Sequence, residues 1–249
     1  MFTRLLVGLD GSAGADAALT AAIDLGRRFR STILLAAITE PGSTDLDRAA
    51  RLTDAAATRA VDAGLGVEIL HASGPVDEEL LRLAEQAEAI VIGRRGEAHA
   101  APGSLGVVTA RIVKKSPRPV VVAGEAPSRF QRPAIAYDGG TTSTSALELA
   151  ARYAEAANVP LDVVHVSDDA DGSELLAKAG AWLSSTHAAF ATHLLHGRLA
   201  QALPAHLAST GIDLLVVGAH GGRRRRSWSV GSHAEQLMRA TTIPVIVIR

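Results

Sequence analysis

The chain has 249 residues and a formal net charge of −1, so no bulk positive charge attracts it to nucleic acid or to an anionic membrane. Hydrophobic residues make up 47% of the sequence and aromatic residues only 3%, which indicates an aliphatic core in one large or two modest domains. The absence of cysteine excludes disulfides, thiolate nucleophiles and cysteine-ligated metal. The chain starts on strand-like residues instead of a signal peptide, and no apolar run reaches the ~18 residues of a membrane span, so we expect a cytoplasmic protein.

Short aliphatic strands alternate with helical segments through the first half. The apolar run 2–9 ends in Asp10-Gly11-Ser12, and apolar residues then recur at helical spacing over 15–29. This alternation predicts right-handed crossovers and a parallel sheet that is covered by helices on both faces. The other strands expected in this half are 33–38, 67–70, 89–92 and 119–123, and the other helices are 45–63, 77–86 and 105–115.

The same pattern starts again after a proline-containing segment, 126–133, which we interpret as a linker. A strand at 134–137 runs into Asp138-Gly139-Gly140, and Asp138 lies 128 positions after Asp10. The chain is therefore an internal duplication, with domains at 1–125 and 134–249. Other matching residues of the two halves lie 125 positions apart, namely Gly93 with Gly218, Gly96 with Gly221, Gly106 with Gly231, and Pro119 with Pro244.

The strongest functional signal follows the apolar run 214–217. Gly218 and Gly221 come first, and nine residues later Gly231-Ser232 opens a helical segment. Glycine lets the backbone approach a ligand closely, and the N–H groups and dipole at a helix start favour phosphate oxygens. The spacing differs from that of a Walker P-loop and of the Gly-x-Gly-x-x-Gly fingerprint. The segment predicts an anion site, and the alternative is a tight turn without a ligand.

Three features of the sequence resemble those of the universal stress protein family. They are the Gly-x2-Gly-x9-Gly-Ser spacing, the strand that ends in Asp-Gly and the Pro-Val-x-Val last strand. Except for the complete glycine signature, these features occur in both halves. The resemblance implies an α/β fold of two tandem, open, Rossmann-like sheets, each with five parallel strands in the order 3-2-1-4-5 and helices on both faces. It also implies that ATP or a related adenine nucleotide binds at the carboxyl ends of strands 1 and 4, where the strand order reverses. Mg²⁺ could accompany the phosphates.

In the second half the resemblance assigns Asp138 to the adenosine end of ATP, and the alternative is an Asp that only caps the next helix. Val166 matches a position whose backbone reads the adenine edge, and the alternative is a core valine. Ser232 would donate to a phosphate or serve as a routine helix N-cap. We expect His220 to contact the loop or a phosphate and not to act as a base. The nucleotide-binding residues expected in this half are Asp138, Gly139, Gly140, Val166, Gly218, His220, Gly221, Gly231 and Ser232.

The first half carries a weaker form of the signature, because Gly106 is followed by Val107 and not by a hydroxyl residue. A charge-assisted hydrogen bond is worth roughly 1.5–3 kcal/mol, or about 10- to 150-fold in affinity. We therefore expect the first half to be the poorer site. Its expected nucleotide-binding residues are Asp10, Gly11, Ser12, Ile38, Gly93, Gly96 and Gly106.

Two clusters of charged or metal-binding side chains need separate interpretation. Residues 223–226 are four consecutive arginines in the glycine loop, and we expect one or two of them to contact phosphate. His193 and His196 are three positions apart in a strand-like run, so their side chains point to opposite faces and no metal site is expected. Pro204 should make the third helix of the second half start late or bend.

These observations favour a tandem stress-response sensor or regulator that binds adenine nucleotide and is not a catalyst, because no nucleophile is paired with a base. The alternatives are a slow ATP hydrolase or adenylating enzyme, or an interaction protein with vestigial sites. We do not expect nucleic acid as a partner, since no aromatic residues interleave with the arginines. The last strand of each half would be a sheet edge, so we expect the halves to pair through these strands about a pseudo-two-fold axis, and a homodimer is also open.

Overall fold

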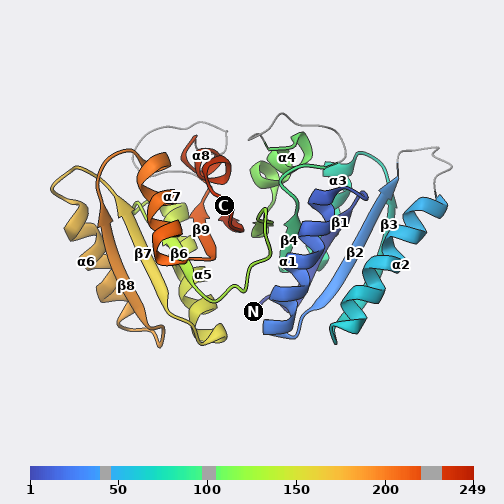
Figure 1. The fold of residues 1–249 in the computed structure, drawn as a ribbon, viewed down its shortest axis with the longest axis horizontal. Coiled ribbons are helices and arrows are strands. Elements are labelled where there is room, and N and C mark those ends of the chain that lie inside the picture. Colours follow the sequence, from blue (N-terminus) through green and yellow to red (C-terminus); the bar gives the residue numbers. More distant parts are fainter. Residues whose placement is uncertain (40–45, 97–104, 220–231) are drawn as a thin grey trace. The chain divides into compact units, whose positions relative to one another are not determined.

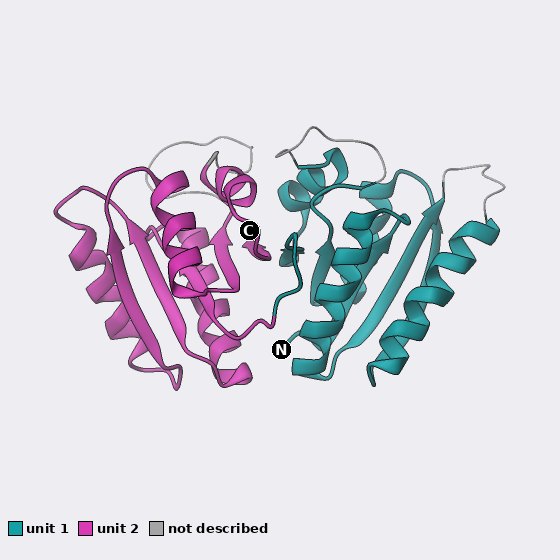
Figure 2. Cartoon of the chain, in the orientation of Figure 1, with its two compact units in different colours: residues 1–128 teal, residues 129–249 magenta. Residues whose placement is uncertain are grey.

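The computed structural model of the chain describes residues 1–39, 46–96, 105–219 and 232–249, and it divides into two compact units (Figure 2). Unit 1 is Met1–Ser128 and unit 2 is Arg129–Arg249. Among the described residues each unit has five parallel strands, and helices lie on both faces of the strands (Figure 1). The expected α/β class is confirmed. The finer domain limits, 1–125 and 134–249, stay a prediction.

In unit 1 the strands lie in the order β3-β2-β1-β4-β5, and each described pair is parallel. Helices α1 and α2 are neighbours on one face, where Arg59 of α2 forms an ion pair with Asp16 of α1. Helices α3 and α4 pack on each other, as right-handed crossovers to β4 and β5 require. The elements are β1 (Arg4–Leu9), α1 (Ala13–Phe29), β2 (Thr32–Thr39), α2 (Leu46–Asp62), β3 (Gly66–Ser73), α3 (Val76–Leu83), the 3-10 turn η1 (Ala84–Gln86), β4 (Ala89–Ile92), α4 (Val107–Lys115) and β5 (Val120–Val122).

Unit 2 repeats this topology, with the strand order β8-β7-β6-β9-β10. Helix α7 begins at Leu199, so Pro204 lies inside the helix and does not delay its start. The elements are β6 (Pro133–Ala136), α5 (Thr141–Ala157), β7 (Leu161–Val166), α6 (Gly172–Leu183), β8 (Phe190–Leu195), α7 (Leu199–Thr210), β9 (Leu214–Gly218), α8 (Ser232–Ala240) and β10 (Val245–Ile248).

The central strands form the core of each unit because they are continuous aliphatic runs. Leu5, Leu6 and Val7 of β1 are fully buried, as are the first three residues of β9. Burial on both faces is typical of a parallel sheet that is covered by helices. The edge strands β3 and β8 are more exposed. Since all strands of a unit run the same way, their carboxyl ends meet at one edge of the sheet, which is where ligands bind in open α/β folds.

Candidate functional site

A cavity of about 580 Å³ opens at the carboxyl ends of β6, β7 and β9 in unit 2. Small-molecule sites commonly measure about 300–1,000 Å³, so a nucleotide fits this volume. The cavity lies where the strand order of unit 2 reverses, between β6, which has β7 on its other side, and β9. Five of the residues expected from the sequence line it, namely Asp138, Gly139, Gly140, Val166 and Gly218.

The turn after β6 forms one wall of the cavity. Asp138 Oδ1 accepts a hydrogen bond from the Gly140 amide at 2.9 Å, which closes a short turn before α5. Gly139 adopts a φ of 74°, and a Cβ there would lie 2.6 Å from Leu175 Cδ1 of α6. The left-handed backbone therefore favours glycine at 139, and a larger residue would also displace the end of the Leu175 side chain.

The phosphate side of the expected site begins at Gly218, the last residue of β9. A Cβ at this position would lie 2.7 Å from the Ser143 amide nitrogen, so the strand end approaches the start of α5 closely. Helix α8 begins at Ser232, and His233 of its first turn lines the cavity. The other expected residues of this segment, His220, Gly221, Gly231 and the arginines 223–226, lie outside the described residues.

The opposite wall holds residues that sequence reasoning missed. His165, the residue before Val166, lines the cavity, and its Nδ1 lies 2.7 Å from the carbonyl oxygen of Tyr137. Asp169 and Asp171, in the loop before α6, also line the cavity. Their position just after the carboxyl end of a buried strand is a sequence signal that could have identified them.

Unit 1 has the corresponding turn after β1, and a side chain of its own lies over it. Asp10 Oδ1 accepts from the Ser12 amide at 2.9 Å, and Ser12 Oγ accepts from the Ala15 amide at 3.1 Å as the N-cap of α1. Arg48 of α2 donates from Nη2 to the Asp10 carbonyl oxygen at 3.0 Å. Gly11 has a φ of 83°. A smaller cavity of about 160 Å³ lies beside this turn between α1 and α2.

The glycine loop after β4 packs on the start of α1. A Cβ on Gly14 would lie 1.8 Å from the Arg95 carbonyl oxygen, and one on Gly93 would lie 2.4 Å from the Gly14 carbonyl. Gly106 is the N-cap of α4, and its amide donates to the Arg94 carbonyl oxygen at 2.8 Å. Gly96 lies beside Asp10, since its Cβ would be 2.6 Å from Asp10 Oδ2. The Asp10 turn and the glycine loop therefore lie together at the carboxyl ends of β1 and β4.

Three further residues of unit 1 belong to its expected site or lie beside it. Val107, which stands where Ser232 stands in unit 2, is 67% exposed at the start of α4. The Arg94 side chain donates from Nε to the Ala123 carbonyl oxygen at 3.1 Å, and burial lowers the pKa of this guanidinium. Ile38 is half-buried near the carboxyl end of β2, as Val166 is at the end of β7.

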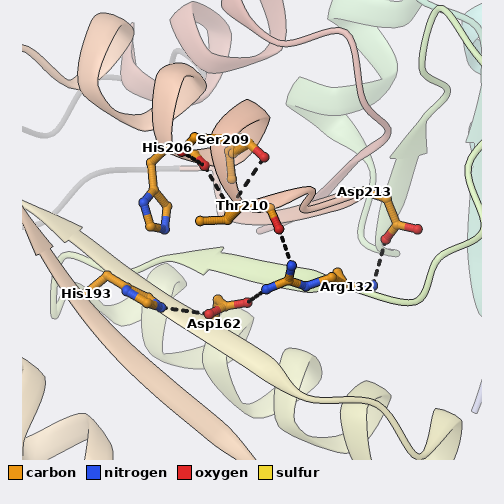
Figure 3. A network of polar contacts seen from close by, with 8 residues as sticks. Arg132, Asp162, His193, His206, Ser209, Thr210 and Asp213 are labelled. Carbon is orange, nitrogen blue, oxygen red and sulfur yellow. Dashed lines mark hydrogen bonds and ion pairs between the residues drawn. The ribbon is translucent and has the colours of Figure 1, made fainter.

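A second group of polar side chains lies away from the cavity in unit 2, around the amino end of β7 (Figure 3). Asp162 is almost fully buried there, and its Oδ1 lies 2.7 Å from Nε2 of His193. Arg132 approaches the other carboxylate oxygen at 3.7 Å and also donates to the Thr210 carbonyl. The His206 ring packs against His193 with centroids 4.8 Å apart, and its buried Nε2 has no hydrogen-bond partner in the structure.

Within the described parts of the chain, no three His, Asp or Glu residues are placed to hold a metal ion. The described helices are each too short or too polar to cross a membrane.

The sequence profile of the universal stress protein family matches this chain twice, over residues 1–124 and 130–249. Universal stress protein Slr1230 of Synechocystis sp. is 32% identical over 190 residues, which cover 74% of this chain and 65% of that protein, just under two thirds of its length. A universal stress protein from Archaeoglobus fulgidus has a similar structure, with a TM-score of 0.81, 20% identity and coverage of 98% of this chain and 95% of that one. A functionally unknown protein from Pseudomonas aeruginosa gives a TM-score of 0.75 at 17% identity, covering 99% and 92%. At these identities the structural matches show a shared fold.

Proposed function

Because the chain belongs to the universal stress protein family in both of its halves, we propose that unit 2 binds ATP or a related adenine nucleotide in the cavity at the carboxyl ends of β6, β7 and β9. The protein would then serve as a stress-response sensor or regulator. The observation that carries this proposal is that the residues expected to bind nucleotide are also residues that line the cavity. Asp138, Gly139, Gly140, Val166 and Gly218 are expected from the sequence and its family resemblance, and the same five line one cavity of suitable volume.

The cavity has ends of different chemistry, which supports one orientation of the ligand. At the α8 end are Gly218, the amino terminus of a helix and His233. A helix start favours phosphate oxygens, and the sequence between β9 and α8 contains four arginines. The triphosphate, with any Mg²⁺ that accompanies it, would lie here. The adenosine would then lie toward Asp138 and Val166.

Unit 1 would be the weaker site. Its helix α4 starts with an exposed valine where unit 2 has a hydroxyl, and Arg48 already occupies the carbonyl of the Asp10 turn. We propose that a titration detects one tighter site per chain.

Two measurements test the proposal. Mass spectrometry of the nucleotide released when freshly purified protein is denatured should identify an adenine nucleotide. Calorimetric titration of nucleotide-free protein with ATP should give a stoichiometry near one for the tighter phase. Failure to bind ATP, ADP or AMP at millimolar concentrations would overturn the assignment, and two sites of equal affinity would overturn the reading of Val107.

The location follows separately. We propose that the protein works in the cytoplasm, as its membership of the universal stress protein family suggests. Fractionation of cells that express the tagged chain would test this, and recovery from a secreted fraction would contradict it.

A further inference from the structure

The segment that leads from unit 1 into unit 2 is anchored near the amino ends of β6 and β7 (Figure 3). The amides of Gln131 and Arg132 donate to the two carboxylate oxygens of Asp213 at 3.0 and 2.8 Å. The Arg132 side chain donates to the Thr210 carbonyl oxygen, and its Nη2 lies 3.7 Å from Asp162 Oδ2. We refer to Arg132, Asp162, Thr210 and Asp213 as the linker anchor.

The contact between Arg132 and Asp162 is the weakest part of the linker anchor. Asp162 is buried, and its Oδ1 lies 2.7 Å from His193 Nε2. An ionised carboxylate can only accept, so Nε2 carries the proton of the His193 ring and donates it. The 3.7 Å between Arg132 and Oδ2 is too long for a hydrogen bond, so this contact is an ion pair only. Asp162 Oδ2 can therefore take a closer donor when one is present.

His206 becomes such a donor when it is protonated. Its ring lies against that of His193, with centroids 4.8 Å apart, and is directed from α7 toward the His193–Asp162 pair (Figure 3). The buried Nε2 of His206 has no hydrogen-bond partner in the described part of the chain. A protonated imidazole carries N–H donors on both nitrogens, and a buried cation needs an acceptor. Asp162 is the carboxylate beside it.

A proton on His206 competes with Arg132 for this carboxylate. While His206 is neutral, the charges of Asp162 and Arg132 balance. Burial lowers the pKa of His206, and His193 and Arg132 lower it further, while Asp162 opposes the shift. Once Arg132 has left, Asp162 pairs with the ring and the pKa is higher. The opened anchor therefore binds the proton more tightly, so acid favours opening and higher pH favours the closed form.

The other elements that pack near His206 have their charges engaged elsewhere. Helix α7 has no other ionisable residue. Helix α8 also packs on α7, and there Glu235 and Arg239 form an ion pair with each other, while His233 lines the proposed nucleotide cavity. The carboxylate of Asp213 accepts the two amides of the linker anchor. Asp162 is thus the acceptor open to a protonated His206.

Unit 1 has a corresponding anchor without histidine. Arg4 donates to both carboxylate oxygens of Glu68 at 2.7 Å and to the Gln86 carbonyl oxygen at 2.8 Å. The Thr3 amide donates to a carboxylate oxygen of Glu88 at 2.6 Å. Among the described residues no histidine is bonded to either carboxylate. Unit 1 therefore supplies an internal control, because carboxylates stay ionised over the range in which histidine titrates.

We infer that the linker anchor of unit 2 is an acid sensor, in which a proton taken up from solvent by His206 displaces Arg132 from Asp162 and loosens the segment 130–132 while unit 2 stays folded. The inference goes beyond nucleotide binding and does not rest on it. It names the proton as a signal to which this chain responds.

Hydrogen exchange followed by NMR tests the inference at about pH 7.5 and pH 5.5, on either side of the ordinary histidine pKa of about 6.5. Protection factors are compared, because they remove the intrinsic pH dependence of exchange. The Gln131 and Arg132 amides should lose about tenfold in protection at the lower pH, the value of one lost polar contact. The Thr3 amide of unit 1 should change by less than about threefold, because its anchor has no histidine.

The Leu215 amide distinguishes local opening from unfolding of the whole unit. It donates to the Pro244 carbonyl oxygen within the buried core and exchanges only when unit 2 unfolds. At the lower pH it should remain at least about tenfold better protected than the Gln131 and Arg132 amides, because the segment opens first.

Two substitutions identify the groups that act. His206→Leu takes up no proton, so the Gln131 amide should have the same protection at both pH values within about threefold. Arg132→Gln removes the guanidinium, so the Gln131 amide should be poorly protected at both. His206→Gln, also neutral, repeats the first test if leucine disturbs the fold as judged by circular dichroism. The control is His187→Gln, an exposed position that should keep the wild-type response.

Three results would overturn the inference. They are unchanged protection of the wild-type segment, the full loss of protection in a folded His206→Leu or His206→Gln chain, and equal protection of the Gln131 and Leu215 amides at the lower pH. In the last case the segment would open only together with the whole unit. None of these results bears on the proposed nucleotide site, because no residue of the linker anchor lines that cavity.

Discussion

At the scale of single residues, Gly14 decides how the glycine loop of unit 1 packs on α1. A Cβ at this position would lie 1.8 Å from the Arg95 carbonyl oxygen. Gly14→Ala should therefore force the loop away from the helix and lower the free energy of unfolding by about 1–3 kcal/mol, the usual cost of overpacking. Urea denaturation would measure the loss.

Gly180→Ala is the matched control for this substitution. Gly180 also lies in a helix, but its Cβ would meet its nearest neighbour, Phe190 Cε2, at an ordinary 3.5 Å. Alanine is favoured over glycine inside helices by up to about 1 kcal/mol, so this variant should be as stable as the wild type or more so. Equal destabilisation by the two substitutions would show that the contact with Arg95 has no special importance.

A substitution of Ser232, the first residue of α8, tests the phosphate end of the proposed site. Ser232→Ala should weaken ATP binding about tenfold, the value of one hydrogen bond, and should weaken AMP binding less because AMP lacks the outer phosphates. Asp138→Ala, at the adenosine end, should weaken both nucleotides alike. Equal losses of ATP and AMP affinity in Ser232→Ala, measured by calorimetry, would contradict the placement of this hydroxyl at the outer phosphates.

At the scale of elements, the polar group around Asp162 joins β7, β8 and α7 and makes their packing sensitive to pH. The pKa of His206 is lowered, chiefly by burial and also by His193 and Arg132, while Asp162 opposes the shift. The unfolded chain therefore takes up this proton first. The contribution of neutral His206 to stability is present above the ordinary histidine pKa of about 6.5 and is lost as the pH falls toward the lower pKa of the folded state.

Unit 2 should accordingly become less stable between about pH 7.5 and pH 5.5, a window set by the ordinary histidine pKa and its downward shift. His206→Leu should reduce this loss, because it removes the titrating group. Urea midpoints at the two pH values would measure the difference. His187→Gln is the control, since His187 is exposed and should leave the pH dependence unchanged. An unaltered pH dependence in His206→Leu would show that other groups cause the loss.

The order and type of the elements were predictable because aliphatic strands and amphipathic helices alternate with little ambiguity. Strand β3 was foreseen only at 67–70, whereas it extends over Gly66–Ser73. The residues outside the predicted range, Gly66 and His71–Ser73, are small or polar, which an exposed edge strand tolerates and an apolar pattern does not reveal. The contact of His165 with the Tyr137 carbonyl could not be predicted from the sequence, because Tyr137 lies just after another strand, β6, and the sequence does not show which atoms meet across the sheet.

At the scale of the whole molecule, the arrangement of the two units stays a proposal. Pro119 and Pro244 accept hydrogen bonds from β4 and β9 through their carbonyls, so the amides of Val120, Val122, Val245 and Val247 point away from the sheet of their own unit. If β5 and β10 pair as the edge positions suggest, these four amides should exchange slowly with deuterium. Rapid exchange at all four, with slow exchange at Val121 and Ile246, would contradict the pairing.

The division into two compact units has a consequence for any search for ligands by thermal shift. Each unit has its own buried core, so each can melt in its own transition. A ligand that binds only unit 2 raises the melting temperature of that unit, in proportion to the logarithm of its concentration relative to the dissociation constant. If unit 1 is the first to melt, a dye that reports the first exposed core will show no change, and a true ligand will be discarded. Probes placed in each unit separately would recover it.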